Sequence, residues 1–404
     1  MKICIAPDSF KESLTAREAA EAIASGVLRA NPDCEIVCVP MADGGEGTVA
    51  AMVDATGGDL RSVRVTGPLG EPVDAEFGIL GDTRASASAN SPAAVIEMAA
   101  ASGLALVPER LRNPLKTTTR GTGELIRAAL DAGAKTIIIG IGGSATVDGG
   151  AGMAQALGVR LLDSSGNDIG PGGGALEHLA SIDISALDKR LAGVRIEVAC
   201  DVDNTLTGPR GAAPVYGPQK GATPQMVEQL SQNLERLAAI IKRDIGIDIA
   251  EMPGGGAAGG LGAGLAAFLG AKIIPGIDIV IRHVRLEEKM RDSQLVFTGE
   301  GRIDSQTPRG KVPAGVARTA AKLGIPAIAL AGSIDYASVT AEEIGVSAMF
   351  CILDGPATLS DACTRTRELL EQTAEQVLRM FLAAKRSRLT AEDAEERRED
   401  QNSK

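Results

Sequence analysis

Short apolar runs that lead into a glycine- or aspartate-bearing loop recur along the chain, and amphipathic stretches alternate with them. Residues 2–6 and 34–39 are two such runs, separated by an amphipathic stretch at residues 14–29. A third run, at residues 136–140, is almost entirely β-branched. This alternation is typical of a parallel sheet covered by helices. We therefore predict an α/β fold in which the loops at the carboxyl ends of the strands bind the ligand.

The last third of the chain returns to the same alternation and indicates a discontinuous first domain. Three late apolar strands are expected to complete the sheet begun at the N-terminus; they are predicted at residues 294–298, 326–331 and 349–353. Residues 61–80 alternate and contain turns, which predicts a hairpin that leaves this sheet, and residues 82–94 are predicted as a loop. We predict a Rossmann-like parallel-sheet domain from residues 1–65 and 290–385, an inserted α/β domain at residues 66–289, and a charged flexible tail at residues 386–404.

Composition excludes several classes of protein. The 404 residues carry a net charge of −11, and only 2% of them are aromatic, which argues against nucleic acid as a partner. The first residues lack the long apolar core of a secretory signal, and no apolar run approaches the roughly 20 residues of a membrane span. We expect a cytoplasmic protein that binds no membrane. With two histidines and six cysteines that form no CxxC pair, zinc chemistry and histidine-based triads are disfavoured.

The glycine-rich segment at residues 140–150 follows a predicted strand and precedes a predicted helix. Glycines there allow the backbone to approach a ligand, and a helix start offers amides to an anion. Gly142, Gly143, Ser144 and Asp148 are the candidate residues of this loop. A second glycine run at residues 254–264 has two equally supported interpretations, an anion-binding backbone or a tight packing seam.

Two further segments combine acidic and basic residues after predicted strands. Asp201 follows one strand, and Lys220 lies in a Gly/Pro-rich frame downstream. After a later strand come Glu300, Arg302, Asp304 and Lys311, which we expect to share one strand-end loop. Gly310-Lys311 is not a Walker A motif, because Val312 stands where Ser or Thr is required. Carboxylates suit Mg²⁺ and lysines suit phosphate, so this combination favours phosphoryl transfer.

The chain resembles the type 1 glycerate kinases, the bacterial glycerate 2-kinase group. The resemblance covers residues 1 to about 385 and is carried by ordered blocks. The blocks are at residues 6–13, 42–48, 119–126, 140–152, 199–202, 216–221, 254–264, 298–305 and 310–313. It implies two α/β domains with the active site in the cleft between them. It also implies Mg²⁺-dependent transfer of the γ-phosphoryl group of ATP to D-glycerate, giving 2-phosphoglycerate.

Roles for individual residues follow from that resemblance together with residue type and loop position. Asp201 and Asp304 are the candidates for the catalytic base and for Mg²⁺, and Lys311 is a further catalytic candidate. The expected contacts with phosphate, glycerate or metal come from Asp8, Lys11, Asp43, Arg120, Lys220, Glu300 and Arg302, and from the amides of residues 142–144. Another hydroxy acid substrate, 3-phosphoglycerate as the product, or an anion sensor without chemistry remain as alternatives. The expected oligomeric state is a monomer or a homodimer.

Overall fold

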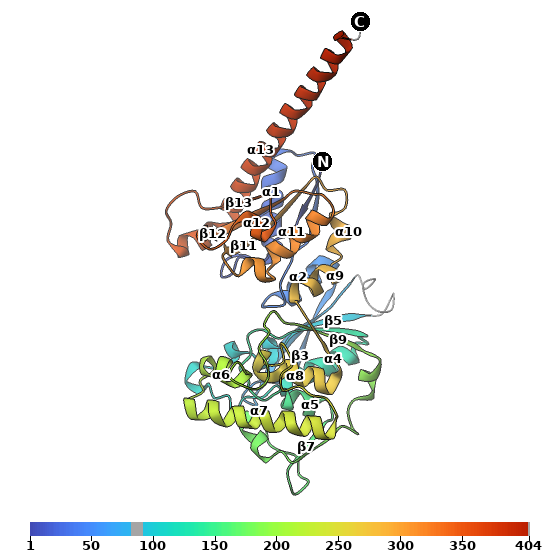
Figure 1. The fold of residues 1–404 in the computed structure, drawn as a ribbon, viewed down its shortest axis with the longest axis vertical. Coiled ribbons are helices and arrows are strands. Elements are labelled where there is room, and N and C mark those ends of the chain that lie inside the picture. The colour runs from blue at the N-terminus through green and yellow to red at the C-terminus, as the bar shows by residue number, and fades with distance from the viewer. Residues whose placement is uncertain (82–91, 403–404) are drawn as a thin grey trace. The chain divides into compact units, whose positions relative to one another are not determined.

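Two separate sheets, each in its own unit of the chain, form the framework of the protein (Figure 1). The computed structural model describes the backbone of residues 1–81 and 92–402, and the side chains of residues 1–81 and 92–386. The first unit consists of Met1–Pro40, Glu287–Pro308 and Val312–Lys404, and the second of Met41–Leu286 and Arg309–Lys311.

The first unit is built on a five-stranded sheet whose strands are all parallel, in the order β13-β12-β11-β1-β2. Counted along the chain this is the order 2-1-3-4-5 of a doubly wound fold. The prediction that the late strands complete the N-terminal sheet is confirmed, because β11 pairs with β1. The strands are β1 (Lys2–Ile5), β2 (Glu35–Cys38), β11 (Leu295–Ile303), β12 (Ala327–Ile334) and β13 (Ala348–Cys351). The helices are α1 (Ala16–Ala30), α10 (Leu286–Met290), α11 (Val312–Lys322), α12 (Ala341–Ile344) and α13 (Leu359–Asn402).

Helices α1 and α13 pack against each other in the first unit. Thr15 begins α1 with a capping box, in which its hydroxyl accepts the Glu18 amide at 3.2 Å and the Glu18 carboxylate accepts the Thr15 amide at 2.9 Å. Gly26 faces α13 so closely that a Cβ there would lie 2.1 Å from the Glu371 carbonyl oxygen. The absence of a side chain at Gly26 therefore sets the distance between the two helices.

The second unit contains a six-stranded mixed sheet in the order β10-β9-β6-β5-β4-β3. β10, β9, β6 and β5 are parallel, whereas β4 runs antiparallel to both β5 and β3. The predicted hairpin within residues 61–80 is confirmed by the β3–β4 pair. The strands are β3 (Asp59–Thr66), β4 (Pro72–Ile79), β5 (Ala93–Glu97), β6 (Thr136–Gly140), β9 (Arg195–Ala199) and β10 (Lys272–Ile274), with a separate ribbon of β7 (Arg160–Leu162) and β8 (Ser181–Asp183). The helices are α2 (Thr48–Thr56), α3 (Ala99–Ser102), α4 (Arg120–Asp131), α5 (Ala151–Ala156), α6 (Ala212–Tyr216), α7 (Pro224–Asp244), α8 (Ala257–Leu269) and α9 (Gly276–His283).

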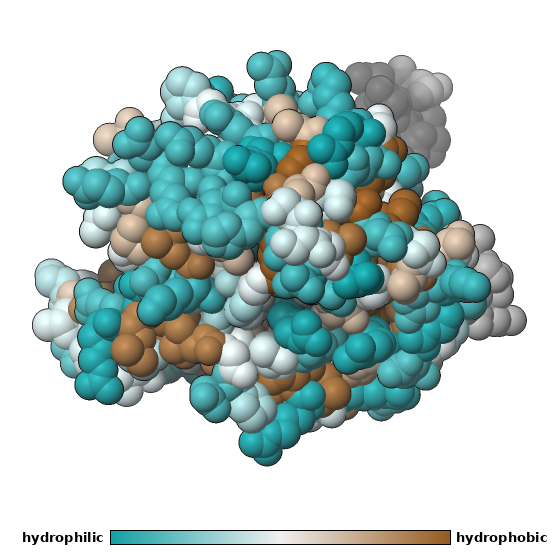
Figure 2. Space-filling view, turned by 90° about the horizontal axis from the view of Figure 1, so that it is seen from below, coloured by the Kyte–Doolittle hydropathy of each residue, from teal (hydrophilic) through white to brown (hydrophobic). Residues whose placement is uncertain are grey.

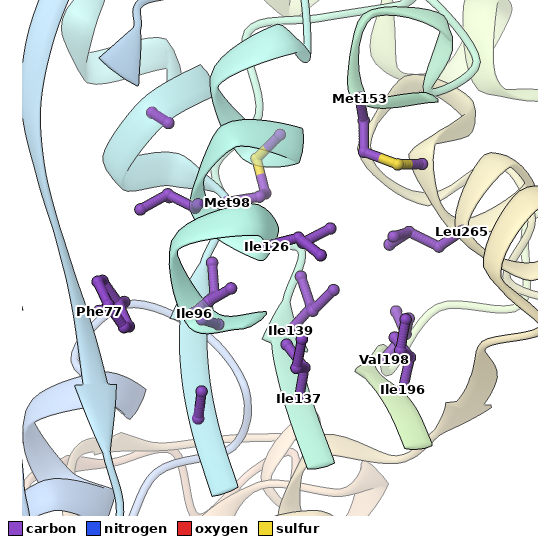
Figure 3. Packing of buried hydrophobic residues seen from close by; sticks show 14 of the residues in the cluster. Phe77, Ile96, Met98, Ile126, Ile137, Ile139, Met153, Ile196, Val198 and Leu265 are labelled. Carbon is purple, nitrogen blue, oxygen red and sulfur yellow. The ribbon is translucent and has the colours of Figure 1, made fainter. Parts of the chain in front are cut away.

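One apolar cluster joins four neighbouring strands of this sheet to the helices that cover it (Figure 3). Phe77, Ile96, Ile139 and Val198 contribute one side chain each from β4, β5, β6 and β9, and Ile126 adds one from α4. All five are at most 3% exposed. Since all five residues of β6 are buried, both faces of the sheet are covered, as expected for the parallel part of an α/β fold.

The contacts place the first division between the units at residue 40, whereas the sequence placed it near residue 65. The boundary lies earlier because β3 and α2 both belong to the second unit. β3 pairs with β4 in the second sheet, and α2 packs against that sheet, with Val53 close to Gly78 of β4. Of the loop predicted at residues 82–94, residues 82–91 lie outside the described residues. Ala93 and Ala94 belong to β5. Residues 386–402 continue α13 as helix.

The face shown in Figure 2 is mostly hydrophilic, with hydrophobic patches separated by polar side chains. No helix among the described residues combines the length and the apolar character that crossing a membrane requires.

Substituting Gly26 tests the packing of α1 on α13. Gly26→Ala should lower the free energy of unfolding by about 1–3 kcal/mol, because the added methyl group forces the helices apart. The intrinsic helix preference of Ala, about 1 kcal/mol over Gly, acts in the opposite direction. Urea denaturation gives the measurement. Ser25→Ala, a half-buried neighbour, should stay within about 0.5 kcal/mol of the wild type, and a stabilised Gly26→Ala protein would contradict the packing argument.

Candidate active-site residues

In the first unit, candidate residues gather where β1 and β11 end. The strand order reverses between these two strands, and doubly wound folds bind ligands at the carboxyl ends of strands at such a point. The Asp8 amide donates to the Gly299 carbonyl oxygen at 2.8 Å, so the loop after β1 runs beside β11. The Asp8 carboxylate accepts the Ser9 amide at 2.7 Å, and Lys11 is exposed further along the same loop.

β11 is longer than predicted, which changes the environment of the acidic residues that follow it. It continues to Ile303, so Glu300 and Arg302 are strand residues rather than members of a strand-end loop. Glu300 is buried and accepts the Thr307 hydroxyl at 2.6 Å. The Asp304 carboxylate accepts the Gln306 amide at 2.9 Å and lies 3.5 Å from the guanidinium of Arg302. Lys311, predicted to share their loop, is grouped with the second unit.

In the second unit, the loop at Asp43–Gly45 crosses the carboxyl ends of β6 and β9. A Cβ at Gly276, the first residue of α9, would lie 1.7 Å from the Asp43 carbonyl oxygen. A Cβ at Gly44 would lie 2.6 Å from the Cβ of Ala199, the last residue of β9. These contacts leave no room for side chains, so backbone lies on backbone across this edge of the sheet.

Asp201 lies at this edge, in the segment that follows β9. Its carboxylate accepts the Gly276 amide at 3.0 Å, at the start of α9. Burial raises the pKa of Asp201 to about 6, the Gly276 amide opposes that rise, and the neighbouring Asp43 and Asp278 carboxylates add to it. A Cβ at Gly310 would lie 3.7 Å from the Asp201 carboxylate, which brings the segment with Lys311 to the same place.

The donor set around Asp201 fits a Mg²⁺ ion only in part. No group of three or more His, Cys, Asp or Glu side chains within the described ranges is arranged to hold a metal by itself. Mg²⁺ in phosphoryl transfer commonly takes one or two carboxylates and completes its shell with water and substrate phosphates. Asp201 with Asp43 meets that smaller requirement, because burial and, to a lesser degree, the neighbouring Asp43 carboxylate raise the pKa of Asp201, and a bound cation would offset both. Asp304, the other predicted ligand, belongs to the first unit.

The glycine loop after β6 has an exposed tip and a buried base. Gly142 and Gly143 are exposed, whereas Ser144 and the residues from there to position 150 are buried. Asp148 accepts hydrogen bonds from the amide and the hydroxyl of Thr119, both at 2.9 Å. The sequence predicted ligand contacts for Asp148 and Lys220, but both side chains are buried and bonded to the protein.

The second glycine run is a packing seam against this loop. A Cβ at Gly259 would lie 1.9 Å from the Thr146 carbonyl oxygen, and one at Gly264 would lie 2.4 Å from the Gly149 carbonyl oxygen. Both glycines belong to α8, which starts with a kink at residues 258–260. Of the two interpretations left open by the sequence, close packing is therefore the one that the structure supports.

Arg120 lies apart from the edge that carries Asp201. It lines a cavity of about 460 Å³ together with Arg160 and Asp168, and it forms an ion pair with Glu124 at 3.2 Å. The structure thus brings Asp43, Asp201 and the Gly310 segment together in the second unit, but it does not bring Arg120 to them.

A buried contact between Glu197 and His283 holds α9 against β9. Glu197 and His283 are each 2% exposed, and their side chains are joined at 2.9 Å. Burial alone would raise the pKa of Glu197, but its bond to His283 and the charges of that ring and of Arg282 and Arg195 leave the pKa below its usual value. The same helix carries Gly276 at its start, so this pair helps to place the amide that Asp201 accepts.

Sequence reasoning missed three residues of the second sheet's edge: Glu97, Gly276 and Asp278. Glu97 ends β5 and accepts the Val49 amide at 2.8 Å at the start of α2, while its burial raises its pKa. The sequence did not predict β5, because its first residues fall in the segment predicted as a loop. It did not predict β10, because this strand has only three residues. The Pro275-Gly276 pair before an amphipathic stretch was the available signal for α9.

Comparison with known proteins gives consistent matches over nearly the whole chain. The sequence pattern of the glycerate kinase family matches residues 3–382. A Bacillus subtilis protein named glycerate kinase is 56% identical over 385 residues, which cover 95% of this chain and 99% of that protein. An Escherichia coli protein named glycerate 2-kinase is 55% identical over 362 residues, covering 90% and 93%. The crystal structure of a putative glycerate kinase 2 from Salmonella typhimurium superposes with a TM-score of 0.86 at 54% identity, covering 95% and 99%.

The raised pKa of Asp201 predicts a pH-dependent stability change. Because the folded protein holds this proton more tightly than the unfolded chain, folding loses free energy as pH rises from about 4 to about 6. Asp201→Asn keeps an acceptor for Gly276 without the charge. It should therefore raise the free energy of unfolding at pH 7.5 by about 1 kcal/mol, a value discounted for solvent exposure, and by close to nothing at pH 3.5.

Chemical denaturation at both pH values measures this difference. Asp203→Asn is the matched control, because Asp203 is exposed on the same segment and pairs with exposed Arg210 at 2.8 Å. It should change stability by less than about 0.5 kcal/mol at pH 7.5. A loss of stability for Asp201→Asn at pH 7.5 would show that the carboxylate is not under electrostatic strain.

Proposed function

The chain belongs to the glycerate kinase family, and from that premise we propose that it transfers the γ-phosphoryl group of ATP to the C2 hydroxyl of D-glycerate. As a member it is an ATP-dependent kinase that acts on an alcohol group. The products of the proposed reaction are 2-phosphoglycerate and ADP. The observation that carries this choice of hydroxyl is the near full-length similarity to the protein named glycerate 2-kinase.

Phosphoryl transfer needs accurate positioning and neutralised charge more than covalent help from the protein. The second unit offers suitable groups at one edge of its sheet, where Asp43 and Asp201 lie next to the segment that carries Lys311. Asp201 and Asp43 would hold Mg²⁺, which when bound neutralises the phosphate oxygens. Lys311 would act on the phosphates as a point charge.

The general base is assigned to one of two carboxylates. Asp201 has a pKa of about 6, so it is mostly ionised at neutral pH and still basic enough to accept a proton from the glycerate hydroxyl. Asp304 is the alternative base or metal ligand, held by the Gln306 amide and by Arg302. Asp8, Lys11, Glu300 and Arg302 are proposed ligand contacts of the first unit, and Arg120 remains a proposed clamp for the glycerate carboxylate.

The exposed amides of Gly142 and Gly143 are proposed to receive the anionic part of one substrate. We further propose that the reaction takes place in the cytoplasm, where ATP is available, by a monomer or a homodimer that needs no nucleic acid and no membrane.

Phosphorus NMR of the product identifies reaction and regiochemistry together. Purified protein is incubated with ATP, Mg²⁺ and D-glycerate, and a 2-phosphoglycerate signal is expected. A 3-phosphoglycerate signal would keep the kinase and overturn the choice of hydroxyl. ADP formation only with another hydroxy acid would change the substrate, and glycerate binding without any ADP formation would support a sensor instead.

Asp201→Asn should lower kcat by about 10²- to 10⁴-fold, the range expected for loss of a general base. A rise in the Mg²⁺ concentration needed for half-maximal rate, with a smaller loss of kcat, would instead assign Asp201 to the metal. Steady-state kinetics at several Mg²⁺ concentrations separate the two roles, and Asp304→Asn measured in parallel shows which carboxylate is the base. Asp203→Asn serves as the control and should leave the rate within about twofold.

A further inference from the structure

Lys220 is a lysine in the interior of the second unit. It ends a short 3₁₀ helix, η5 (Pro218–Lys220), that lies between α6 and α7 in the chain, and it is 2% exposed. Its ammonium donates to the Ser144 hydroxyl at 2.6 Å and to the Thr146 carbonyl oxygen at 2.8 Å. Both acceptors belong to the glycine loop after β6. A buried ammonium is expensive to desolvate, so its retention calls for a reason beyond packing.

The loop that Lys220 supports separates into an exposed tip and a fixed base. Gly143 has φ of 72°, a backbone conformation that glycine adopts without strain. Within the described part of the chain, no carbonyl or side chain accepts a hydrogen bond from the amides of Gly142 and Gly143. These amides at the tip are therefore available to an anion, whereas the base is bonded to the interior.

The base is also held by Thr117 and Thr119. Thr117 donates its hydroxyl to the Ala145 carbonyl oxygen at 2.8 Å, and Asp148 accepts two hydrogen bonds from Thr119. Asp148 further accepts the amides of Gly150 at 3.1 Å and Gly152 at 3.3 Å. Both carboxylate oxygens of Asp148 therefore accept hydrogen bonds from the protein. Lys220 is then the group at the base of the loop that can gain or lose a proton.

Two buried polar groups at the base of the loop lower the stability of the fold when no ligand is bound. Burial lowers the pKa of Lys220 to about 7, although the Asp148 carboxylate, whose own pKa is raised by burial, acts against that fall. The hydroxyl oxygen of Thr146 is buried without a hydrogen-bond partner among the described residues. Groups that lower stability in this way are typical of functional segments rather than of structural cores.

We propose that Lys220 is a positioning residue of the kinase reaction, which holds the glycine loop in shape from inside the fold. Its ammonium keeps the Gly142 and Gly143 amides at the place where an anionic substrate group binds, and it adds positive charge behind them without touching the substrate. The proposal rests on the proposed function for its kinetic consequences, but the loop geometry that it describes does not depend on activity.

Lys220→Met tests the proposal, because methionine keeps the unbranched apolar part of the side chain and lacks only the terminal ammonium. Hydrogen–deuterium exchange of the peptide covering residues 140–150, measured without substrate, should become at least about tenfold faster. The KM for either MgATP or D-glycerate should rise about 10- to 100-fold, the range for losing a charged hydrogen bond. The KM of the other substrate should change by less than about threefold, and kcat by less than about tenfold.

The pH dependence separates a charged support from a merely structural one. In the wild type the affected KM should rise above pH 7 as Lys220 loses its proton, and in Lys220→Met this rise should be absent. Asp148 is the acidic side chain whose charge acts on Lys220; burial raises its own pKa, and its four protein hydrogen-bond donors oppose that rise. Lys242→Met is the control, since Lys242 is an exposed lysine of α7 paired with Asp248 at 2.6 Å, and it should leave exchange and both KM values unchanged.

Two results would overturn the proposal: unchanged exchange at residues 140–150 in Lys220→Met, or loss of kcat with both KM values intact, which would indicate direct participation in the chemistry. If Lys220→Met fails to fold, Ser144→Ala removes one of the two acceptors and should shift exchange and the same KM in the same direction by a smaller factor. A wild type that forms no ADP with D-glycerate would count against the proposed function, while the exchange experiment would still decide the role of Lys220.

Discussion

The contact of the Asp43–Gly45 backbone with the start of α9 is the constraint on which the rest of the second unit's edge depends. Gly276 and Gly44 have no side chains there, so two segments far apart in the sequence meet backbone to backbone. That meeting places the Gly276 amide on the Asp201 carboxylate and buries it, which raises its pKa, and the nearby Asp43 and Asp278 carboxylates add to the rise. Any larger residue at Gly276 would move the helix and with it the carboxylates.

Buried charge is used in three different ways in the second unit. Glu197 of β9 is bonded to His283 and pairs with Arg282, and both of these residues belong to α9. Asp201 remains without a cationic partner among the charges that shift its pKa, so it costs stability and gains the basicity that a kinase site can use. Lys220 donates a hydrogen bond to the glycine loop from the interior, and the hydrogen-bonded Asp148 carboxylate lies near enough to affect its pKa.

Most long elements of the fold were predictable because they are locally periodic. β6 was predicted with its observed bounds, and the amphipathic stretch predicted at residues 14–29 corresponds to α1. The short strand β10 and the strand β5 were missed, since three residues carry too little pattern and an Ala/Ser-rich approach conceals a strand. The predicted domain boundary differed because strand pairing, which is non-local, assigns β3 to the second sheet.

The sequence by itself determined the α/β class, the glycine and aspartate loops at strand ends, and a resemblance specific enough to identify the family. All of these depend on local patterns or on the order of motifs along the chain. Only the tertiary structure decided that Lys220 and Asp148 lie inside the fold, that the second glycine run packs against the first, and that Asp278 joins Asp43 beside Asp201. Burial and electrostatic environment arise from segments more than 50 residues apart, and no local pattern encodes which of them will meet.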